Sequence, residues 1–485
     1  SRGNSRMAHL LRITDYNGTV NLNAGNQSLL SYVPRSPSLS TVDFTPEALT
    51  DGGERLSITR RNVTESAQVL FGGTAVTDIQ AAVGSVEQYL KQAEHYQMYG
   101  AGSPVYLEFQ PNGAGTVYRS EILSGKVELD DLTLSAGQWN RNKVKGVLAH
   151  TRRFYWEDAT ERTLQLYNSA GTSTTGLTVY NCNDGTPPTG RYNYAEIAGS
   201  SVAGDYPAPI NLRMWNTLAG YRAINHIWVG HNFLDTPASF QHMYEELTTN
   251  ANVTGGLASA AYGGGTATRI AAAAGSAIFY NFSAAQLAYI KGAGYFRVLA
   301  RFGSPPPSDG STKIRWYVGN GDLSGTPAYY NYQGPQLTLS SDIIQDLGVV
   351  PIRPRQIGTA AAGTVALSMS FMSGGSSNLD CDFWQLTPVD SFCRYTVAKV
   401  DNPRLANGMG IVDNAIDGWL YSTDQATQGS ALADIVRIGQ GPLLRPGYTQ
   451  RLYFLSEDVE VDIPAANIAR TMSIVASYRP RKLTI

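Results

Sequence analysis

Residues 77–109 read TDIQAAVGSVEQYLKQAEHYQMYGAGSPVYLEF, and their apolar pattern changes once, from the period of a helix to that of a strand. In the first part the apolar residues recur every three or four positions, which lines one helical face: Ile79, Val83, Val86, Leu90, Ala93 and Tyr96. Thr77 with Gln80 forms a capping-box pattern, and Gly100 stands where a left-handed C-cap residue is favoured. We therefore expect one long amphipathic helix over 78–98.

The segments on both sides of this helix have the composition and turn signals of β-strands. Upstream, Leu10–Thr14 and Thr19–Leu22 flank Tyr16-Asn17-Gly18, which predicts a hairpin. Downstream, short strands separated by turns continue to the end of the chain. The predicted fold class is mainly β, with multidomain β-sandwiches, one long amphipathic helix and an inserted jelly-roll domain.

The strand and turn spacing divides the chain into four parts. Residues 1–6 are expected to be a flexible N-terminal tail, and 7–158 a β-sandwich that carries the helix. A second β-sandwich is expected from 159–233 together with 397–485. Residues 234–396 form a series of short strands with its own beginning and end, and they are predicted to be an inserted jelly roll.

Composition narrows the possible functions. Charged residues make up 16% of the 485 positions, against a usual value of about 25%, and 37 basic and 39 acidic side chains leave a formal net charge of −2. This disfavours a charged disordered chain and a strongly basic nucleic-acid binder. The most apolar window, 270–290, is interrupted by polar residues, so no membrane span is expected. Three scattered cysteines, Cys182, Cys381 and Cys393, are expected to be buried and reduced, with a Cys381–Cys393 pair as the alternative.

Three local patterns resemble a known family. The block from Asp78-Ile79-Gln80 through Pro104–Glu108 to Arg152–Trp156 resembles the ring-forming N-terminal domain of tail proteins of long-tailed bacteriophages, the distal tail and tail-tube group. The runs Pro207–Arg213 and Ser477–Arg481 are similar to strand ends of prophage tail proteins. The resemblance covers residues 7–230 and 397–485.

The resemblance implies a structural virion protein that assembles with itself into a ring or tube and contacts other tail proteins. It implies a place in the virion tail after assembly in the host cytoplasm, and no catalysis. On this interpretation the long helix and the basic C-terminal cluster lie at subunit contacts. The candidate oligomer-contact residues are Ile79, Val83, Val86, Leu90, Arg479 and Arg481.

A second resemblance lies inside the insert. Leu379–Pro388 resembles the final strand of carbohydrate-binding jelly-roll modules, which implies attachment to a host-surface glycan. Exposed aromatic rings beside Asn or Gln suit sugar faces and hydroxyls, so the candidate glycan-binding residues are Tyr329, Tyr330, Asn331 and Tyr332. The alternative is that these tyrosines cover a sandwich edge.

Metal and catalytic motifs are weak. Asp380 and Asp382 share a strand face and are a candidate Ca²⁺ site, with plain surface charge as the alternative. His226 and His231 flank Trp228, where a metal pair is conceivable and ordinary half-buried or surface histidines are the alternative. Neither a nucleophile elbow nor a phosphate loop occurs in the sequence. We therefore expect no enzymatic activity, no cofactor and no sequence-specific nucleic-acid binding.

Two other functions stay open. The chain could be a free carbohydrate-binding or adhesion protein, or a glycan-degrading enzyme whose carboxylates meet only in the folded state. Self-assembly separates a tail protein from a free adhesin. Turnover that is lost when one acidic pair is replaced would identify the enzyme.

Overall fold

The computed structural model describes residues 9–44, 54–129, 143–183, 190–217, 223–233, 248–249, 253–259, 262–271, 277–282, 294–307, 310–320, 330–352, 365–373, 378–398, 404–424, 434–458 and 463–485. The chain is mainly β with one longer helix, as predicted. It divides into two compact units. Unit 1 comprises Ser1–Arg162, Ala203–Pro207 and Arg479–Ile485, and unit 2 comprises Thr163–Val202 and Ala208–Tyr478. The described part of the chain contains no helix with the length and apolarity that a membrane crossing requires.

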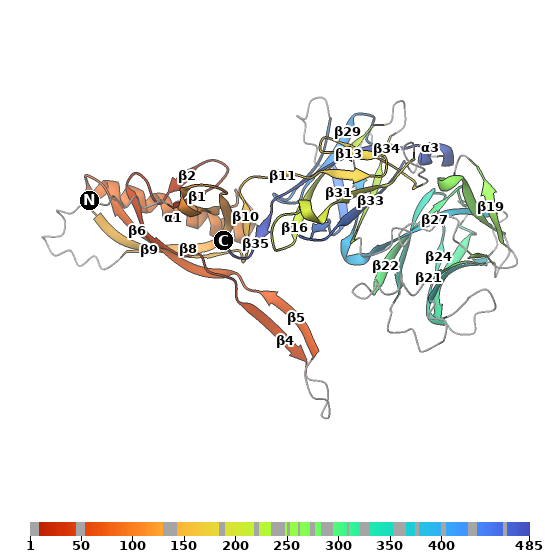
Figure 1. Cartoon of the computed structure of the whole chain (residues 1–485), viewed down its shortest axis with the longest axis horizontal. Coiled ribbons are helices and arrows are strands. Elements are labelled where there is room, and N and C mark those ends of the chain that lie inside the picture. The colour runs from red at the N-terminus through yellow and green to blue at the C-terminus, as the bar shows by residue number, and fades with distance from the viewer. Residues whose placement is uncertain are drawn as a thin grey trace. The chain divides into compact units, whose positions relative to one another are not determined.

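Unit 1 is built on one sheet, which has nine strands among the described residues (Figure 1). Its order is β2-β1-β7-β8-β9-β6-β3, with β10 paired to β8 and β35 paired to β10. The strands are β1 (Leu10–Thr14), β2 (Thr19–Asn21), β3 (Gln27–Tyr32), β6 (Val63–Gly72), β7 (Tyr106–Gln110), β8 (Tyr118–Leu129), β9 (Lys143–Arg152), β10 (Trp156–Asp158) and β35 (Arg481–Lys482). A separate two-stranded sheet is formed by β4 (Leu39–Phe44) and β5 (Glu54–Arg60).

The predicted hairpin at the start of the chain is confirmed, because β1 pairs with β2 in antiparallel register. The Asp15 carboxylate closes the turn by accepting hydrogen bonds from the backbone N–H groups of Asn17 and Gly18, at 2.8 and 2.7 Å. This Asx-type contact is the local reason that the Tyr16-Asn17-Gly18 sequence turns here.

Helix α1 (Val76–Tyr99) covers the predicted range and packs its apolar stripe onto the sheet of unit 1. Its start differs from the prediction, because Thr77 lies inside the helix and does not cap it. The Asp78 carboxylate instead accepts hydrogen bonds from the N–H groups of Thr74 and Ala75, at 2.8 and 2.9 Å. At the other end, Gly100 has the predicted left-handed conformation, with φ 64°.

A buried polar network joins β3, β6 and β9 in unit 1. Glu65 accepts hydrogen bonds from the Tyr32 hydroxyl and from Arg152 Nε, the latter at 2.7 Å, and its carboxylate lies 3.3 Å from His150 Nε2. Burial raises the pKa of Glu65, but the hydrogen bonds from His150 and Arg152 outweigh it and lower that pKa to about 2. Glu65 also accepts the N–H of Arg35 at 2.9 Å, so the network holds the chain just before β4.

Unit 2 contains a β-sandwich of two sheets, here called the host sandwich. Among the described residues one sheet has the order β11-β34-β16-β29-β30 with β14 and β32 at its margins, and the other has the order β13-β12-β15-β33-β17-β28-β31. The bounds are β11 (Arg162–Thr163), β12 (Leu166–Asn168), β13 (Gly171–Ser173), β14 (Leu177–Tyr180), β15 (Tyr194–Ile197), β16 (Ala208–Asn216), β17 (His226–Phe233), β28 (Phe392–Val397), β29 (Met409–Asn414), β30 (Trp419–Asp424), β31 (Ile435–Gly439), β32 (Leu443–Leu444), β33 (Gln450–Glu457), the short helix α3 (Pro464–Ile468) and β34 (Thr471–Tyr478).

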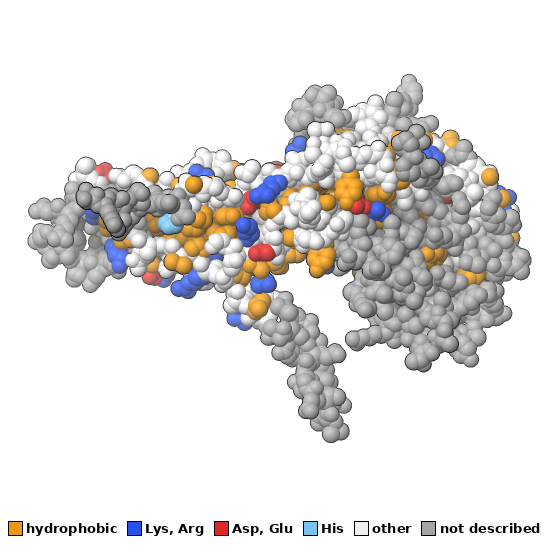
Figure 2. Space-filling model, in the orientation of Figure 1, with side chains coloured by type: hydrophobic (Ala, Val, Ile, Leu, Met, Phe, Trp, Pro, Cys, Tyr) orange, Lys and Arg blue, Asp and Glu red, His pale blue; other side chains and the backbone are white. Residues whose placement is uncertain are grey.

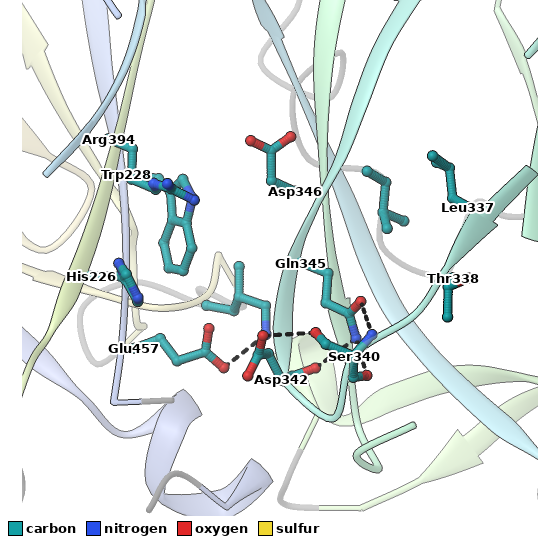
Figure 3. A pocket seen from close by; sticks show the side chains of 12 residues that line it. His226, Trp228, Leu337, Thr338, Ser340, Asp342, Gln345, Asp346, Arg394 and Glu457 are labelled. Carbon is teal, nitrogen blue, oxygen red and sulfur yellow. Dashed lines mark hydrogen bonds between the residues drawn. The ribbon is translucent and has the colours of Figure 1, made fainter. Parts of the chain in front are cut away.

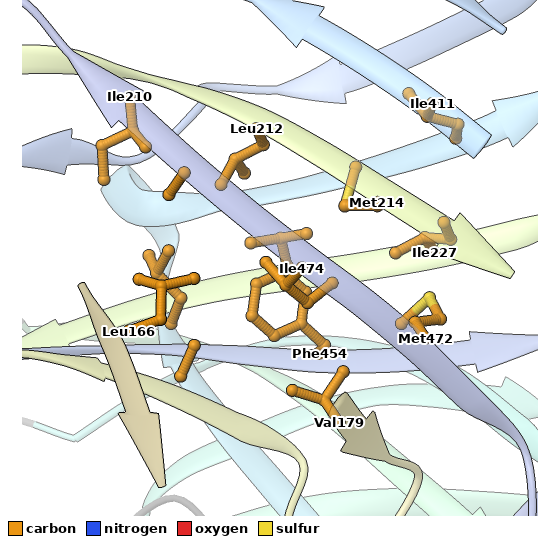
Figure 4. Packing of buried hydrophobic residues seen from close by; sticks show 14 of the residues in the cluster. Leu166, Val179, Ile210, Leu212, Met214, Ile227, Ile411, Phe454, Met472 and Ile474 are labelled. Atoms are coloured by element: carbon orange, nitrogen blue, oxygen red, sulfur yellow. The ribbon is translucent and has the colours of Figure 1, made fainter. Parts of the chain in front are cut away.

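The core of the host sandwich lies between these two sheets (Figure 4). Alternate residues of the central strand β16, Ile210, Leu212 and Met214, point into it, and Ile474 of β34 and Phe454 of β33 meet them there. This period of two is what half-buried strands of a sandwich require.

The remaining strands form a second sandwich between β17 and β28, here called the insert. Its sheets have the orders β18-β21-β26-β23-β24 and β19-β20-β27-β22-β25 among the described residues. The bounds are β18 (Thr248–Thr249), β19 (Val253–Ala258), β20 (Thr266–Ile270), β21 (Ala277–Phe282), β22 (Tyr295–Phe302), β23 (Lys313–Asn320), β24 (Tyr330–Thr338), β25 (Ile344–Pro351), β26 (Val365–Ser373) and β27 (Leu379–Pro388). Trp316 and Trp384 meet edge to face in its core, with ring centroids 4.9 Å apart.

The second sandwich is predicted to include all of 159–233 and 397–485, whereas the last seven residues, Arg479–Ile485, and also Ala203–Pro207 belong to unit 1. The reason is that β35 pairs with β10 and that Arg481 forms an ion pair with Glu157 at 2.8 Å. All strands of the insert fall within the predicted range 234–396, and the predicted tail 1–6 lies outside the described residues.

The packing of α1 predicts a large difference between two substitutions on the same helix. Leu90 is 2% exposed, so Leu90→Ala should lower the free energy of unfolding of unit 1 by about 2–5 kcal/mol. Met98 is 68% exposed, so Met98→Ala should change it by less than about 0.5 kcal/mol. Denaturant unfolding followed by the helical circular dichroism signal measures both. Equal effects of the two changes would contradict this packing.

Candidate functional site

A cavity of about 270 Å³ lies between the host sandwich and the insert, both within unit 2 (Figure 3). We call it the junction pocket. Its host side is formed by His226 and Trp228 of β17, Arg394 of β28 and Glu457 of β33. Its insert side is formed by the end of β24, the turn after it and the start of β25, with the lining residues Leu337, Thr338, Ser340, Asp342, Ile344, Gln345, Asp346 and Leu347.

Strand register places the host-side residues together. His226 and Trp228 are two positions apart on β17, so they share a face of the sheet. Arg394 lies directly opposite Trp228 on one neighbouring strand, and Glu457 lies opposite His226 on the other. In Figure 3 these four side chains stand on one side of the pocket, with Asp342, Gln345 and Asp346 on the other.

The insert side is shaped by hydrogen bonds within one turn. Gln345 Nε2 donates to the carbonyl oxygens of Ser340 and Asp342, at 2.7 and 2.9 Å, and the Ser340 hydroxyl donates to the Asp342 carboxylate at 2.7 Å. Glu457 then ties this turn to the host sandwich, because its carboxylate accepts the N–H groups of Ile343 and Ile344 at 2.8 and 3.0 Å. The turn is therefore held by hydrogen bonds within it and by the Glu457 carboxylate of the host sandwich.

The electrostatics of the pocket combine anionic and cationic groups. Asp346 is neutralised by Arg297 at 2.7 Å, whereas the described residues offer Asp342 no ion pair and Arg394 no ion pair or hydrogen bond. Burial, followed by the nearby Arg394, lowers the pKa of His226, and Asp342 acts in the opposite direction. His226 is thus held in its neutral form near neutral pH, with Nδ1 3.0 Å from the Thr396 hydroxyl.

Below the pocket the two sandwiches share a buried apolar cluster, in which Trp228 and Leu455 of the host sandwich meet Leu299 and Phe383 of the insert. Arg301 of the insert, fully buried, crosses the same junction. It forms an ion pair with Asp382 and donates to Asn467 Oδ1 at 2.9 Å and to the Pro464 carbonyl at 2.8 Å. These contacts make the wall of the pocket part of a packed interface.

The candidate metal residues Asp380 and Asp382 are engaged by arginines. Asp380 accepts two hydrogen bonds from Arg269, at 2.7 and 2.9 Å, and a third from the Tyr262 hydroxyl at 2.9 Å. Asp382 pairs with Arg301 and accepts the N–H of Gly263. Both are buried, so the alternative interpretation as surface charge is wrong. No group of three or more His, Cys, Asp or Glu placed to hold a metal ion occurs in the described part of the chain.

Three of the four candidate glycan residues, Tyr330, Asn331 and Tyr332, lie in β24. Tyr329 lies outside the described residues, and Tyr330 and Asn331 are the first two residues of β24. Tyr332 is half-buried and packs against the core of the insert. Glycan binding at this strand stays a prediction. The sequence patterns do not predict the junction pocket, although they place His226 close to Trp228.

The candidate oligomer-contact residues are occupied within unit 1. Val86 and Leu90 fill its core, and Ile79 and Val83 pack against that core, so the apolar stripe covers the unit's own sheet. Arg479 donates to the Ala159 carbonyl, and Arg481 pairs with Glu157. A subunit contact through the buried pair Val86 and Leu90 would need surface that they do not expose.

The histidine pair and the cysteines are also separated. His231 is buried and lies 3.1 Å from Gln450 Oε1, away from the face that His226 shares with Trp228. Burial lowers the pKa of His231 to about 4. Cys182, Cys381 and Cys393 are buried thiols that form no disulfide, so the alternative of a Cys381–Cys393 pair is wrong.

No protein-family model and no curated protein matches the chain. Among solved structures it is similar to the SPP1 Dit (gp 19.1) protein, described as a paradigm of hub adsorption apparatus in Gram-positive infecting phages, with a TM-score of 0.33, 7% identity, and coverage of 97% of this chain and 98% of that chain. It is also similar to the phage P2 baseplate in its activated conformation with Ca, with a TM-score of 0.27, 10% identity, and coverage of 76% and 99%. The same baseplate with Sr gives a TM-score of 0.26, 10% identity, and coverage of 78% and 98%. All three TM-scores are below 0.5.

The contact between Glu457 and the turn predicts how fast two backbone amides on the insert side of the pocket exchange with solvent. Glu457→Ala leaves two buried N–H groups without an acceptor, at a cost of about 1–3 kcal/mol each, so the amides of Ile343 and Ile344 should exchange with solvent at least about tenfold faster. Glu457→Gln keeps one side-chain oxygen and should have the smaller effect. Hydrogen exchange measures both, and unchanged rates in Glu457→Ala would contradict the contact.

The lowered pKa of His231 predicts a pH dependence of stability. Between about pH 6.5 and about pH 4 the unfolded chain binds a proton at His231 that the folded chain does not, so the free energy of unfolding should fall as the pH is lowered. The decrease is at most about 1.4 kcal/mol per pH unit. Denaturant unfolding across this range should give a flatter curve for His231→Gln. The same slope in both proteins would contradict a buried neutral imidazole.

Proposed function

We propose that the chain is a structural protein of a bacteriophage tail, which assembles with itself through unit 1 into a ring or tube and attaches to a host-surface glycan through unit 2. The sequence resemblance described above supports this proposal. The structural observation that carries it is the β4–β5 hairpin of unit 1, whose two strands pair only with each other among the described residues. The proposed role involves no catalysis.

The hairpin is an unusual element for an isolated chain. Figure 1 shows β4 and β5 projecting away from the large sheet of unit 1. An isolated two-stranded hairpin is at best marginally stable in water, and both of its outer edges carry unpaired backbone groups. Pairing with a neighbouring subunit satisfies these groups, so the projecting hairpin supports self-assembly.

The base of the hairpin is rigid, which suits an arm that must reach a neighbour. The Arg35 N–H is bound by Glu65 at 2.9 Å, and the Arg35 carbonyl accepts a hydrogen bond from Arg152 Nη2, also at 2.9 Å. Both partners belong to the buried network of the large sheet. The chain is therefore fixed four residues before β4 begins.

Apolar side chains are exposed next to this arm. Leu30 on the edge strand β3 is 49% exposed, Val33 is 75% exposed, and Leu39 at the start of β4 is 58% exposed. Figure 2 shows that apolar side chains and Lys or Arg side chains intermingle over the visible face of unit 1. Exposed apolar side chains beside an open strand edge are typical of a surface that binds another chain.

The solved structures named above, a hub protein and a baseplate, belong to the class proposed here. The proposal rests on the features of this chain and not on that likeness. A free carbohydrate-binding or adhesion protein is the second candidate, since it needs the glycan site but no assembly.

The register of the hairpin identifies the backbone groups to remove. The Arg61 N–H donates to the Ser38 carbonyl, so by alternation the N–H groups of Thr41 and Ile58 point away from the partner strand. Thr41→Pro with Ile58→Pro removes these outward donors and keeps the bonds inside the hairpin. We expect light scattering to report an assembly for the unmodified chain and a mass near the 52.4 kDa monomer for this variant.

The matched control is Thr41→Ala with Ile58→Ala, which shortens the same side chains but keeps both N–H groups. It should still assemble. An unmodified chain that remains a monomer at high concentration would contradict the tail proposal, and sugar binding by that monomer would favour the free adhesin. Assembly of the proline variant would show that the hairpin edges are not the contact.

A further inference from the structure

The junction pocket holds polar groups that the fold itself does not use. Trp228 is 3% exposed, and its indole Nε1 has no hydrogen-bond partner among the described residues. Arg394, opposite it, has a buried Nε that also lacks one. A buried donor without an acceptor costs about 1–3 kcal/mol, so both groups favour a ligand that brings acceptors into the pocket.

The opposite wall offers acceptors. The Asp342 carboxylate receives one hydrogen bond, from the Ser340 hydroxyl, and forms no ion pair among the described residues. Thr338 and Ser340, both exposed at the rim, add hydroxyl groups. A ligand in this pocket therefore needs donors facing the insert and acceptors facing the host sandwich.

The charges exclude several classes of ligand. Asp342 and Glu457 repel a phosphate or another anion, whereas Asp346 is already paired with Arg297, and Arg394 opposes a cation. The polar lining disfavours an apolar ligand. A neutral polyhydroxylated molecule fits both walls, because each hydroxyl donates and accepts.

The volume limits the size of the ligand. At about 270 Å³ the cavity is slightly smaller than the roughly 300–1,000 Å³ that hold drug-sized ligands. It has the volume of roughly nine water molecules at about 30 Å³ each, which suits one sugar ring and not a longer chain.

We propose that the junction pocket binds one neutral pyranose unit, with Trp228 Nε1 and Arg394 donating to its oxygens and Asp342 accepting from its hydroxyls. The proposal rests on the proposed attachment role of unit 2, and it places the sugar at the junction instead of at Tyr329–Tyr332. The pyranose can be a free monosaccharide or the terminal residue of a surface polysaccharide, since both present the same hydroxyl groups.

The test titrates the full chain with glucose, galactose, mannose and N-acetylglucosamine, and with their methyl glycosides, by saturation-transfer NMR and isothermal titration calorimetry. We expect at least one of the four sugars to bind saturably. A methyl glycoside that binds as well as its free sugar identifies a terminal residue of a chain, and loss of binding on methylation identifies a free monosaccharide.

Two variants locate the site. Asp342→Asn removes a charged acceptor, and Trp228→Phe removes the indole donor together with the five-membered part of the ring; each should weaken binding about tenfold. Asp417→Asn makes the same charge change outside the pocket lining, and Tyr332→Phe tests the strand predicted from the sequence. Both of these should bind as the unmodified chain does. Thermal unfolding confirms that each variant is folded.

The proposal is overturned if none of the sugars binds, or if Asp342→Asn and Trp228→Phe both bind with unchanged affinity. Loss of binding in Tyr332→Phe alone would move the site to β24. Light scattering on the same samples keeps the outcomes separate, because an assembled protein that binds no sugar contradicts the pocket and leaves the tail assembly standing, and a sugar-binding monomer contradicts the tail assembly alone.

Discussion

The antiparallel pairing of β17 with β28 is the constraint on which unit 2 depends. His226 lies opposite Thr396 and Gly230 opposite Phe392, so the chain leaves and re-enters the host sheet through neighbouring strands. A separate sandwich can therefore form between them without interrupting the hydrogen bonds of the host sheet. The same register sets Arg394 beside Trp228, and the insert covers both. The junction pocket is thus a consequence of how the insert is joined to its host.

In unit 1, the helix and the buried carboxylate have packing and hydrogen-bond partners within the unit, whereas the β4–β5 hairpin has few among the residues described. Its helix covers the large sheet with the stripe that includes Val86 and Leu90, and its buried carboxylate Glu65 is bound by three side chains. The β4–β5 hairpin lacks such support among the described residues, although its base is held firmly through Arg35. Natural proteins avoid projecting strand pairs that have no partner, because exposed strand edges cause non-specific association. A specific partner strand explains both the rigid base and the open edges.

Patterns among neighbouring residues predict local structure, but they do not predict which distant strands pair or in which register. The helix period and the Asn17-Gly18 turn follow from residues close in sequence, and the structure confirms them. The apolar stripe of α1 predicts that one face is buried, but not whether a sheet or a subunit covers it. In the sequence, Asp380 and Asp382 have the spacing of a cation site. In the structure they form ion pairs with Arg269 and Arg301, which are distant in sequence. Asp342 and Arg394 meet only through strand pairing, which the sequence does not display.

The central claim is that the open edges of the hairpin pair with another copy of the chain. Hydrogen exchange at the amides of Thr41 and Ile58, compared between concentrated and dilute protein, tests it most directly. The account predicts that these two outward-facing amides are protected in concentrated solution and lose protection on dilution, while the amides of β8, which pairs with β7 and β9, stay protected throughout. Rapid exchange of Thr41 and Ile58 in a sample that light scattering shows to be assembled would contradict it.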